Sequence, residues 1–379
     1  MILSLLTALT LTVQDDAWAR LPEPVTNNAV AGVELDGQMM AYSFAGLHEG
    51  KTWRDVTADA YACNLTARTC REIDGLPDGI GRLASVAVTV RGQIYIFGGY
   101  TVAEDHSERS TPEVWRFDPA SETYTHITDI PVPVDDTVAL VHQDRYIYLV
   151  SGWHDTDNVD LVQVYDVEED RWFEATPFRG RPVFGHAGAL LGQDSRFQAQ
   201  MLVCGGTAVF PPESDGARRS FRAISDCWAG VIVDAPEVIQ WGNVGELPGG
   251  PFYRGAATTF GTHFVSFWAG TDNAFNFNGI GYNQAPSEPR ADTQGGLFRN
   301  AFEGSCREWT NVSPVVWRAP RWTTMPTAPA IMDIRGIIAF DPQNAFILGG
   351  MMQGQVVTDG VTKLPTLDDL DTIIISGCH

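Results

Sequence analysis

The feature that most restricts the fold of this chain is a short phrase that occurs six times along it. Each copy has an aromatic residue, or a cysteine in one copy, followed several residues later by proline. The copies are Trp18 to Pro22, Cys70 to Pro77, Tyr124 to Pro131, Trp172 to Pro177, Trp241 to Pro248 and Trp322 to Pro326. After each copy comes a short alternating apolar segment, a turn and a second apolar segment, which predicts a β-hairpin. Repetition of this kind indicates one structural unit used six times.

A constant spacing fixes the outer half of the unit. A turn residue lies six positions before the aromatic position in three copies: Asn64 before Cys70, Asp118 before Tyr124, and Asp166 before Trp172. A turn at a fixed offset sets the register of an antiparallel hairpin, whereas a two-sheet sandwich with chance similarity would not produce it. We therefore predict four strands in each unit. In the fifth unit Trp309 and Trp322 compete for the outer strand, and the distance to the next unit favours Trp322.

The second apolar segment of each unit ends in a pair of small residues. The pairs are Gly98-Gly99, Gly205-Gly206 and Gly349-Gly350, with Ala45-Gly46, Ser151-Gly152 and Ala269-Gly270 in the other units. The unit has a hairpin that ends in Gly-Gly, then a variable loop, then Tyr-Asp or Phe-Asp-Pro before a Trp-bearing strand. In this order of elements the chain resembles the kelch family over about residues 15–379. The resemblance implies a single-domain, six-bladed β-propeller with each first strand at a central channel.

The two ends of the chain are expected to share the last unit. The final segment, "DTIIISGCH", is expected to form its third strand, and no residues remain for a fourth. We therefore expect "AWARLP" near the N-terminus to supply the missing strand and to remove the open sheet edge.

The N-terminal segment and the cysteines indicate export. An apolar run from Ile2 to Val13 has the length of the apolar part of a signal peptide, which we place at residues 1–14. Cys63 and Cys70 flank one hairpin turn, and Cys204 and Cys227 stand at the end of a second strand and the start of a third, so either pair could bridge adjacent strands. Cys306 and Cys378 are then left to pair by elimination, with no spacing that fixes this pair. Disulfides would place the protein in the periplasm or outside the cell, and the alternative is six reduced, buried thiols.

The charge of the chain excludes several classes of partner. The net charge is −22, with two lysines against twenty-three arginines. Such a chain repels nucleic acid and anionic membranes, so we expect neither as a partner. We expect no cofactor. His48, His106 and His154 lack the spacing of metal ligands, so we expect no metal.

The insertions of the repeat gather on one face of the predicted propeller. Connections from second to third strands, and from fourth strands to the next first strands, open on this face, which we call the loop face. The starts of the first strands converge there around the channel: Asn28, Arg82, Asp136, His186, Arg254 and Arg335. The three arginines among them could bind a carboxylate ligand. The alternative is that they pair with neighbouring acids and cap strand ends.

Among kelch proteins the plan is similar to the bacterial N-acetylneuraminate epimerases, which are sialic acid mutarotases. The similarity rests on six units, Leu21 to Glu23, a long loop in the fifth unit and "VVTDG" after the last Gly-Gly pair. It implies a catalytic Glu and Arg in a loop of the fourth unit, where Glu213 and Arg219 are the candidates. The implied reaction is anomeric interconversion of a carboxylated sugar through ring opening, with Glu213 or His186 as the base. A non-catalytic kelch module that binds a protein or ligand is the alternative.

Overall fold

The computed structural model describes residues 17–191, 199–260, 264–274 and 330–365, and the backbone of residues 294–297 and 321–324. The described part is almost entirely β-structure. It holds two short 3-10 helices, η1 (Trp53–Asp55) and η2 (Gln353–Gln355). No helix within these ranges is long and apolar enough to cross a membrane. The predicted signal peptide and the pair Cys306 and Cys378 lie outside the described residues.

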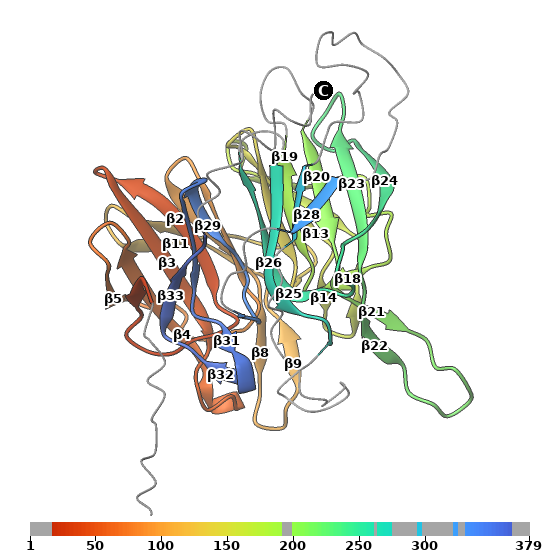
Figure 1. The fold of residues 1–379 in the computed structure, drawn as a ribbon, viewed down its shortest axis with the longest axis horizontal. Coiled ribbons are helices and arrows are strands. Elements are labelled where there is room, and N and C mark those ends of the chain that lie inside the picture. The colour runs from red at the N-terminus through yellow and green to blue at the C-terminus, as the bar shows by residue number, and fades with distance from the viewer. Residues whose placement is uncertain are drawn as a thin grey trace, which may run out of the picture.

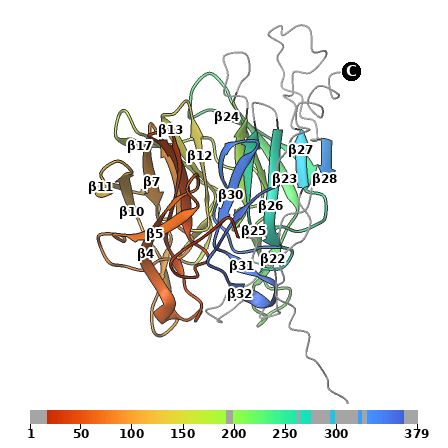
Figure 2. The same cartoon turned by 60° about the vertical axis from the view of Figure 1, so that its left-hand side comes forward.

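Within the described residues, six antiparallel sheets have four strands each (Figures 1 and 2). We number the sheets in chain order of their first strands. Sheet 1 has β2 (Ala29–Leu35), β3 (Gln38–Leu47), β4 (Val56–Asn64) and β5 (Thr69–Ile73), and sheet 2 has β6 (Val86–Val90), β7 (Gln93–Phe97), β10 (Glu113–Asp118) and β11 (Thr123–Asp129). Sheet 3 has β12 (Val138–His142), β13 (Tyr146–Val150), β16 (Val162–Asp166) and β17 (Arg171–Glu174), and sheet 4 has β19 (Ala187–Leu191), β20 (Gln200–Cys204), β23 (Asp226–Ile232) and β24 (Ile239–Glu246). Sheet 5 has β25 (Tyr253–Phe260), β26 (Phe264–Thr271), β27 (Gln294–Leu297) and β28 (Arg321–Thr324), and sheet 6 has β29 (Ile338–Asp341), β30 (Asn344–Leu348), β33 (Gly360–Lys363) and β1 (Ala19–Arg20).

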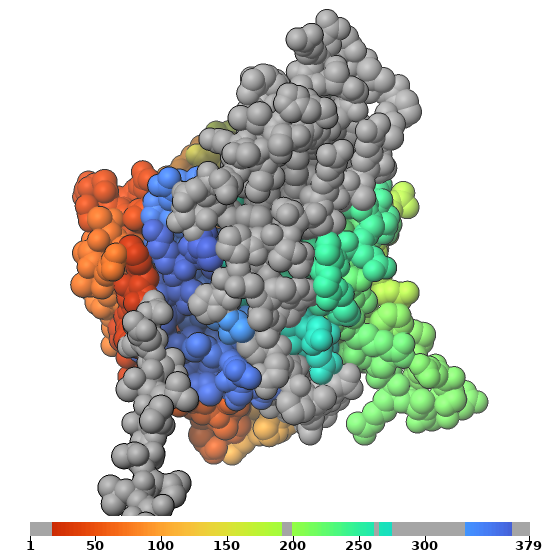
Figure 3. All heavy atoms as spheres, viewed as in Figure 1, coloured from red at the N-terminus to blue at the C-terminus, as the bar shows by residue number. Residues whose placement is uncertain are grey.

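Smaller sheets form on the connections between second and third strands, and one of them also includes β18, which precedes the first strand of sheet 4. They pair β8 (Tyr100–Val102) with β9 (Glu108–Ser110), β14 (Trp153–His154) with β15 (Asp157–Asn158), β21 (Thr207–Phe210) with both β18 (Val183–Phe184) and β22 (Ser220–Ala223), and β31 (Met351–Met352) with β32 (Val356–Val357). These hairpins build up the loop face, as the insertions predicted. The β21–β22 hairpin, labelled in Figure 1, projects from the body as the green extension at the lower right of Figure 3.

The pairs of small residues share one backbone conformation. Both positions have positive φ, as in Gly98 (φ 52°) with Gly99 (φ 96°) and Ser151 (φ 55°) with Gly152 (φ 115°). A Cβ atom at Gly99 would lie 2.6 Å from the carbonyl oxygen of Leu83, at the start of the same sheet. The φ angle distinguishes the two positions: it is 52–73° at the first, which alanine and serine can adopt, and 80–124° at the second, where every pair has glycine.

A chain of backbone hydrogen bonds links the starts of the six first strands. One residue in each start has positive φ, and we call these six the ring residues: Asn27, Ala84, Asp136, Gly185, Arg254 and Asp333. The bonds run Asn27 N–H to Asp333 O (2.9 Å), Ala84 to Asn27 (3.3 Å), Asp136 to Ala84 (3.1 Å), Gly185 to Asp136 (2.8 Å), Arg254 to Gly185 (2.8 Å) and Ile334 to Arg254 (3.2 Å). Each sheet start is therefore bonded to its two neighbours in the sequence of sheets, and the last to the first.

Sheet 6 takes its edge strand from the N-terminal part of the chain. Ala19 and Arg20 of β1 pair with Val361 and Gly360 of β33, as expected for "AWARLP". The third strand, however, is β33 and not "DTIIISGCH", which lies outside the described residues. The short β31–β32 hairpin returns the chain directly to β30, so the nearer segment forms the third strand.

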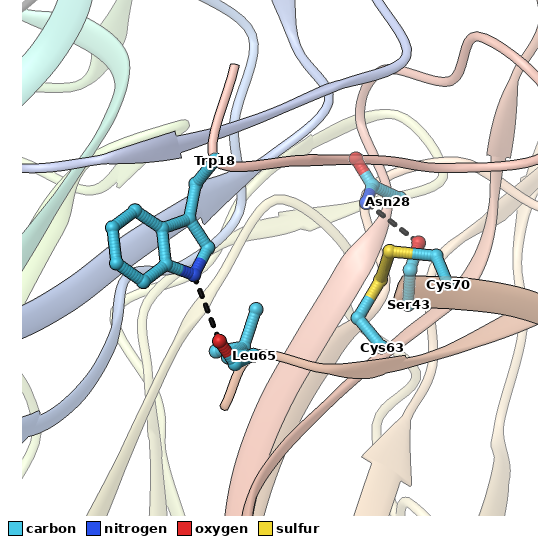
Figure 4. The surroundings of a disulfide bond; sticks show 6 residues. All are labelled: Trp18, Asn28, Ser43, Cys63, Leu65 and Cys70. Atoms are coloured by element: carbon cyan, nitrogen blue, oxygen red, sulfur yellow. Dashed lines mark hydrogen bonds between the residues drawn. A yellow bond between two sulfur atoms is a disulfide. The ribbon is translucent and has the colours of Figure 1, made fainter. Parts of the chain in front are cut away.

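Trp18 joins sheet 6 to sheet 1. Its Nε1 donates to the carbonyl oxygen of Leu65 at 2.9 Å, beside the Cys63–Cys70 disulfide (Figure 4). The Arg68 guanidinium and the Lys363 ammonium lie 3.5 and 4.6 Å from its ring centroid.

The disulfides predicted for Cys63–Cys70 and Cys204–Cys227 are both present. Trp322 lies in β28, the outer strand of sheet 5, as the spacing favoured.

Removal of residues 1–22 is expected to lower the melting temperature strongly, because sheet 6 loses β1 and the junction loses Trp18. Trp18→Ala is the milder change. It should cost about 2–3 kcal/mol of unfolding free energy, below the range of fully buried Trp sites. The matched control is Trp53→Ala in η1, at the opposite end of β4 from Leu65, with an expected cost below about 1 kcal/mol. Equal costs for the two variants in urea titrations would contradict the role of Trp18.

Candidate functional site

All six first strands line a central channel. A cavity of about 310 Å³ is bounded by residues of β2, β6, β12, β19, β25 and β29, including Gly32, Thr89 and Thr259. A second cavity of about 140 Å³, which we call the inner chamber, lies nearer the strand starts. The two share wall residues from each of the six sheets, such as Val30, Ala139 and, just before β29, Ile337, so they are successive parts of one channel.

A buried ionic network lies among the ring residues. Asp136 accepts hydrogen bonds from Arg254 Nη2 at 2.6 Å and from Arg335 Nη1. On its other side Arg254 donates to Asp333 at 3.2 Å. Asp333 also accepts from Thr26 Oγ1 at 2.9 Å and Asn27 Nδ2 at 2.8 Å. The network thus joins sheets 1, 3, 5 and 6 through side chains as well as backbone.

The two carboxyl groups of the network differ in their electrostatics. Burial alone would raise the pKa of Asp136, but the Arg254 and Arg335 cations outweigh burial and hold this pKa below its ordinary value. Burial raises the pKa of Asp333, and the same cations offset only part of that effect. Asp135, the neighbour of Asp136, is buried and hydrogen-bonded to Ser110 Oγ at 2.6 Å. Burial and then the Asp136 charge raise the pKa of Asp135 well above its usual range.

His186 is buried beside this network, in the wall of the inner chamber. Its Nε2 lies 2.9 Å from the carbonyl oxygen of Val150, and its Nδ1 has no hydrogen-bond partner in the described structure. Burial lowers the pKa of His186 to about 4, so the imidazole is neutral near pH 7. Since Val150 O can only accept, Nε2 carries the ring proton.

The predicted cluster of three arginines is divided. Arg254 and Arg335 share Asp136, whereas the buried Arg82 pairs with Asp78 and with Glu113 at 3.4 Å. These ion pairs match the alternative in which the arginines pair with neighbouring acids. Binding of a carboxylate ligand by the three arginines stays a prediction. Asn28 donates to Ser43 Oγ at 2.7 Å (Figure 4) and to Leu348 O at 3.3 Å, outside the ionic network.

The candidates of the fourth unit lie on the β21–β22 hairpin. Glu213 is 82% exposed and pairs with Arg222 at 2.7 Å. Arg219 donates to the carbonyl oxygen of Thr156 at 2.6 Å and is 41% exposed. Within the described residues, no hydrogen bond or ion pair joins Glu213, Arg219 and His186. The structure therefore separates the three predicted catalytic residues into an exposed hairpin and a buried channel wall.

Arg219 belongs to a cluster of arginines and aromatic rings on the loop face. Its guanidinium lies 5.3 Å from the ring centroid of Trp153 and 5.2 Å from that of Phe221. On the other side of the hairpin, Arg181 and Arg222 lie 4.5 and 4.9 Å from the Phe210 ring. We call this set the hairpin cluster. Its arginines are half-exposed or exposed cations in a chain of net charge −22.

Sequence reasoning missed Asp333, Asn27 and Asp135. In several sheets the residue predicted to lie at the channel is one or two positions away from the ring residue, as with Asn28 beside Asn27 and Arg335 near Asp333. The sequence did hold a usable signal, because in four sheets the ring residue lies two positions before the first strand, as Asn27 before Ala29 and Asp136 before Val138. Within the described residues, no three His, Cys, Asp or Glu side chains form a group that could hold a metal ion.

The buried neutral state of His186 predicts a stability change at acidic pH. An unfolded histidine has a pKa of about 6.5. Between pH 6.5 and 4, residue 186 therefore binds a proton in the unfolded chain but not in the folded chain. The wild type should lose about 3 kcal/mol of unfolding free energy relative to His186→Gln across this window. Urea titrations at pH 7 and pH 4 measure it. A wild-type-to-variant difference that does not change with pH would contradict the buried neutral imidazole.

The comparisons with known proteins agree with this architecture. Residues 81–131 match the family model described as "Kelch motif". Kelch-like protein 15 of Gallus gallus is 26% identical over 154 residues, which cover 37% of this chain and 30% of that protein. The Homo sapiens protein of the same name is 23% identical over 154 residues, covering 37% and 24%. An F-box/kelch-repeat protein of Arabidopsis thaliana is 26% identical over 132 residues, covering 33% and 37%.

A solved structure, that of YjhT, superposes with a TM-score of 0.64 at 12% identity, covering 92% of this chain and 97% of that chain. At this identity the superposition concerns the fold alone. The matched region spans well under half of the length of the curated relatives. The motif, the relatives and the fold together support the kelch-repeat family for this chain.

Proposed function

We propose that the six four-stranded sheets are the blades of a closed, six-bladed kelch propeller. The backbone hydrogen bonds between ring residues support this, since they run from each sheet start to the next and return from Asp333 to Asn27. The pairing of β1 with β33 supports closure by an N-terminal strand. The channel walls, to which each of the six first strands contributes, support the count of blades.

We further propose that this propeller binds a small carboxylated carbohydrate at the hairpin cluster on its loop face. The observation that carries the proposal is Arg219, which is held against the Trp153 and Phe221 rings and remains 41% exposed. Its nearest carboxylate, Asp157, is 64% exposed and 3.8 Å away, so the pair is weak. A guanidinium fork matches a carboxylate in two hydrogen bonds. A neighbouring aromatic ring offers the apolar face of a sugar a flat partner.

Anomeric interconversion is the finer form of this proposal. Its support is the sequence resemblance to the N-acetylneuraminate epimerases, which implies a catalytic Glu and Arg in the fourth unit, with Glu213 and Arg219 as the candidates. In this form Arg219 holds the sugar carboxylate and Glu213 removes the anomeric hydroxyl proton, while the ring oxygen takes up a proton as its bond to the anomeric carbon breaks. The exposure of Glu213 favours binding over catalysis, because a general base is usually placed where burial or a neighbour tunes its proton affinity.

A non-catalytic role in protein binding is the second candidate. The observation that favours it is the projection of the β21–β22 hairpin from the body, with residues 211–219 all exposed (Figure 3). Export to the periplasm or beyond is part of both candidates. The disulfides Cys63–Cys70 and Cys204–Cys227 support it.

Calorimetric titration with N-acetylneuraminate tests the binding proposal. Arg219→Ala removes a charge-assisted contact and should weaken binding about tenfold to a hundredfold. The matched control is Arg171→Ala, because Arg171 also lies over an aromatic ring, 5.4 Å from the Phe173 centroid, but at the opposite end of sheet 3. Equal affinities of wild type and Arg219→Ala would refute the site.

N-acetylmannosamine, which lacks the carboxylate, is the ligand control and should bind far more weakly than N-acetylneuraminate. Exchange NMR of the two anomers of N-acetylneuraminate separates binding from catalysis. Accelerated exchange that Glu213→Gln abolishes would support the enzyme. Binding with no acceleration would leave the carbohydrate-binding module and exclude the mutarotase.

A further inference from the structure

The tip of the β21–β22 hairpin is the longest unbroken exposed run in the described part of the chain. Residues 211–219 are all exposed, and the hairpin projects from the body (Figure 3). No strand or helix includes them, because β21 ends at Phe210 and β22 begins at Ser220. One backbone hydrogen bond between described residues lies within the run, from Ala217 N–H to Ser214 O at 3.1 Å. Exposed loop tips of small and polar residues, with few backbone hydrogen bonds, are the preferred sites of proteolytic cleavage.

The tip carries two adjacent arginines, and the surrounding structure holds only the second. Nη1 of Arg219 donates to Thr156 O at 2.6 Å, and its guanidinium lies 5.3 Å from the Trp153 ring centroid. Arg218 is exposed, and among the described residues no hydrogen bond, ion pair or ring contact holds its side chain. The Arg218 side chain is therefore available to enter the pocket of a partner protein, whereas that of Arg219 would first have to leave its contacts.

A trypsin-like endoprotease requires an arginine or lysine of this kind. It binds the side chain before the bond that it cuts in a deep pocket with an aspartate at its base. Other exposed arginines of the described ranges are less suitable. Arg109 lies within β9 and is followed by the buried Ser110, and the guanidinium groups of Arg54 and Arg68 lie over the rings of Trp53 and Trp18.

A disulfide closes the base of the same hairpin. Cys204 is the last residue of β20, and Cys227 lies directly opposite it on β23 in sheet 4. The β21–β22 hairpin leaves the sheet after Cys204 and returns before Cys227, so this disulfide would join the two chains that a cut at the tip produces. The Cys63–Cys70 disulfide lies entirely on the N-terminal side of the tip.

The two sides of the tip are also held together by the fold. The ring bonds Arg254 N–H to Gly185 O and Asn27 N–H to Asp333 O each connect a residue before position 218 with one after it. Strands β20 and β23 remain paired in sheet 4, and β1 remains paired with β33 in sheet 6. A single cut at the tip therefore breaks no strand pairing and leaves both connections intact.

We propose that the β21–β22 hairpin is a processing site, cut between Arg218 and Arg219 by an arginine-specific, trypsin-like endoprotease. Water adds across this peptide bond, which leaves a carboxylate on Arg218 and an amino group on Arg219. The product is a folded two-chain protein, residues 1–218 and 219–379, joined by Cys204–Cys227. The proposal does not depend on sugar binding at the hairpin cluster.

Limited digestion of the full folded chain with trypsin, followed by mass spectrometry over time, tests the accessibility of the bond. Cleavage after Arg218 should be at least about tenfold faster than cleavage after Arg54, Arg68 or Arg109, because those bonds require a larger local opening. In denaturant, the fragment that ends at Arg218 should stay attached to the part that contains Cys227 until a reductant is added. Equal rates at the four arginines, or release of the fragment without reductant, would overturn the proposal.

Two variants locate the cut. Arg218→Gln should abolish cleavage in the hairpin, because Arg219 remains held against Trp153 and Thr156. Arg109→Gln, which removes an exposed arginine from the neighbouring β8–β9 hairpin, is the matched control and should leave cleavage after Arg218 unchanged. The cut wild type should melt within about 4 °C of the intact protein, since no strand pairing is lost. Cleavage after Arg219 in Arg218→Gln, or a much larger drop in melting temperature, would contradict the account.

The protein isolated from the organism that produces it, with protease inhibitors present throughout, decides whether the site is used. Mass spectrometry should detect a chain that ends at Arg218 and a chain that begins at Arg219. An intact bond between residues 218 and 219 in all of the isolated protein would overturn the processing site, even where trypsin cuts the purified chain.

Discussion

The structure depends on the backbone hydrogen bonds that join the starts of the six first strands. Each bond requires a residue with positive φ at the innermost point of its sheet, a conformation that side-chain-bearing residues adopt at a cost. Asn27, Asp136 and Asp333 suit it because short polar side chains can bond locally, and Gly185 suits it because it has no Cβ. The strain at Ala84 and Arg254 persists because both neighbours hold the backbone in place. The glycine pairs at the ends of the second strands then allow the sheet starts to lie this close together.

The ionic network adds side-chain links to this ring at an electrostatic cost. Burying Arg254, Asp136, Asp333 and Arg335 removes four charged groups from water, and their pairing with one another offsets part of that cost. Asp136 and Asp333 are well supplied with donors, whereas Arg335 and His186 each keep one buried nitrogen without a hydrogen bond in the described structure. This unequal pairing distinguishes the acidic members of the network from two residues that line the inner chamber.

The sequence predicted the sheets well because turns and glycines have local causes. The Asp36-Gly37 and Arg91-Gly92 turns both have the two positive φ angles of a tight hairpin, and Cys63 and Cys70 lie directly opposite each other as their spacing required. The third strand of sheet 6 was misplaced because "DTIIISGCH" has the stronger strand composition, while the nearer segment Gly360–Lys363 has the shorter connection. The site was predicted less well, since a one-residue error at the start of a first strand exchanges a ring residue for its neighbour. No local pattern shows that Arg254 pairs with Asp136, which lies 118 residues away.

Native-state hydrogen exchange of the ring amides tests the central claim most directly. The amides of Asn27, Ala84, Asp136, Gly185, Arg254 and Ile334 each donate to the preceding sheet start. If these bonds form one closed ring, all six amides should exchange only through global unfolding, with one common free energy that falls with denaturant as the whole-protein value does. Exchange of Asn27 or Ile334 at a much lower free energy than the other four would contradict a closed ring. It would show that the sheets open at the junction of sheets 6 and 1 or of sheets 5 and 6.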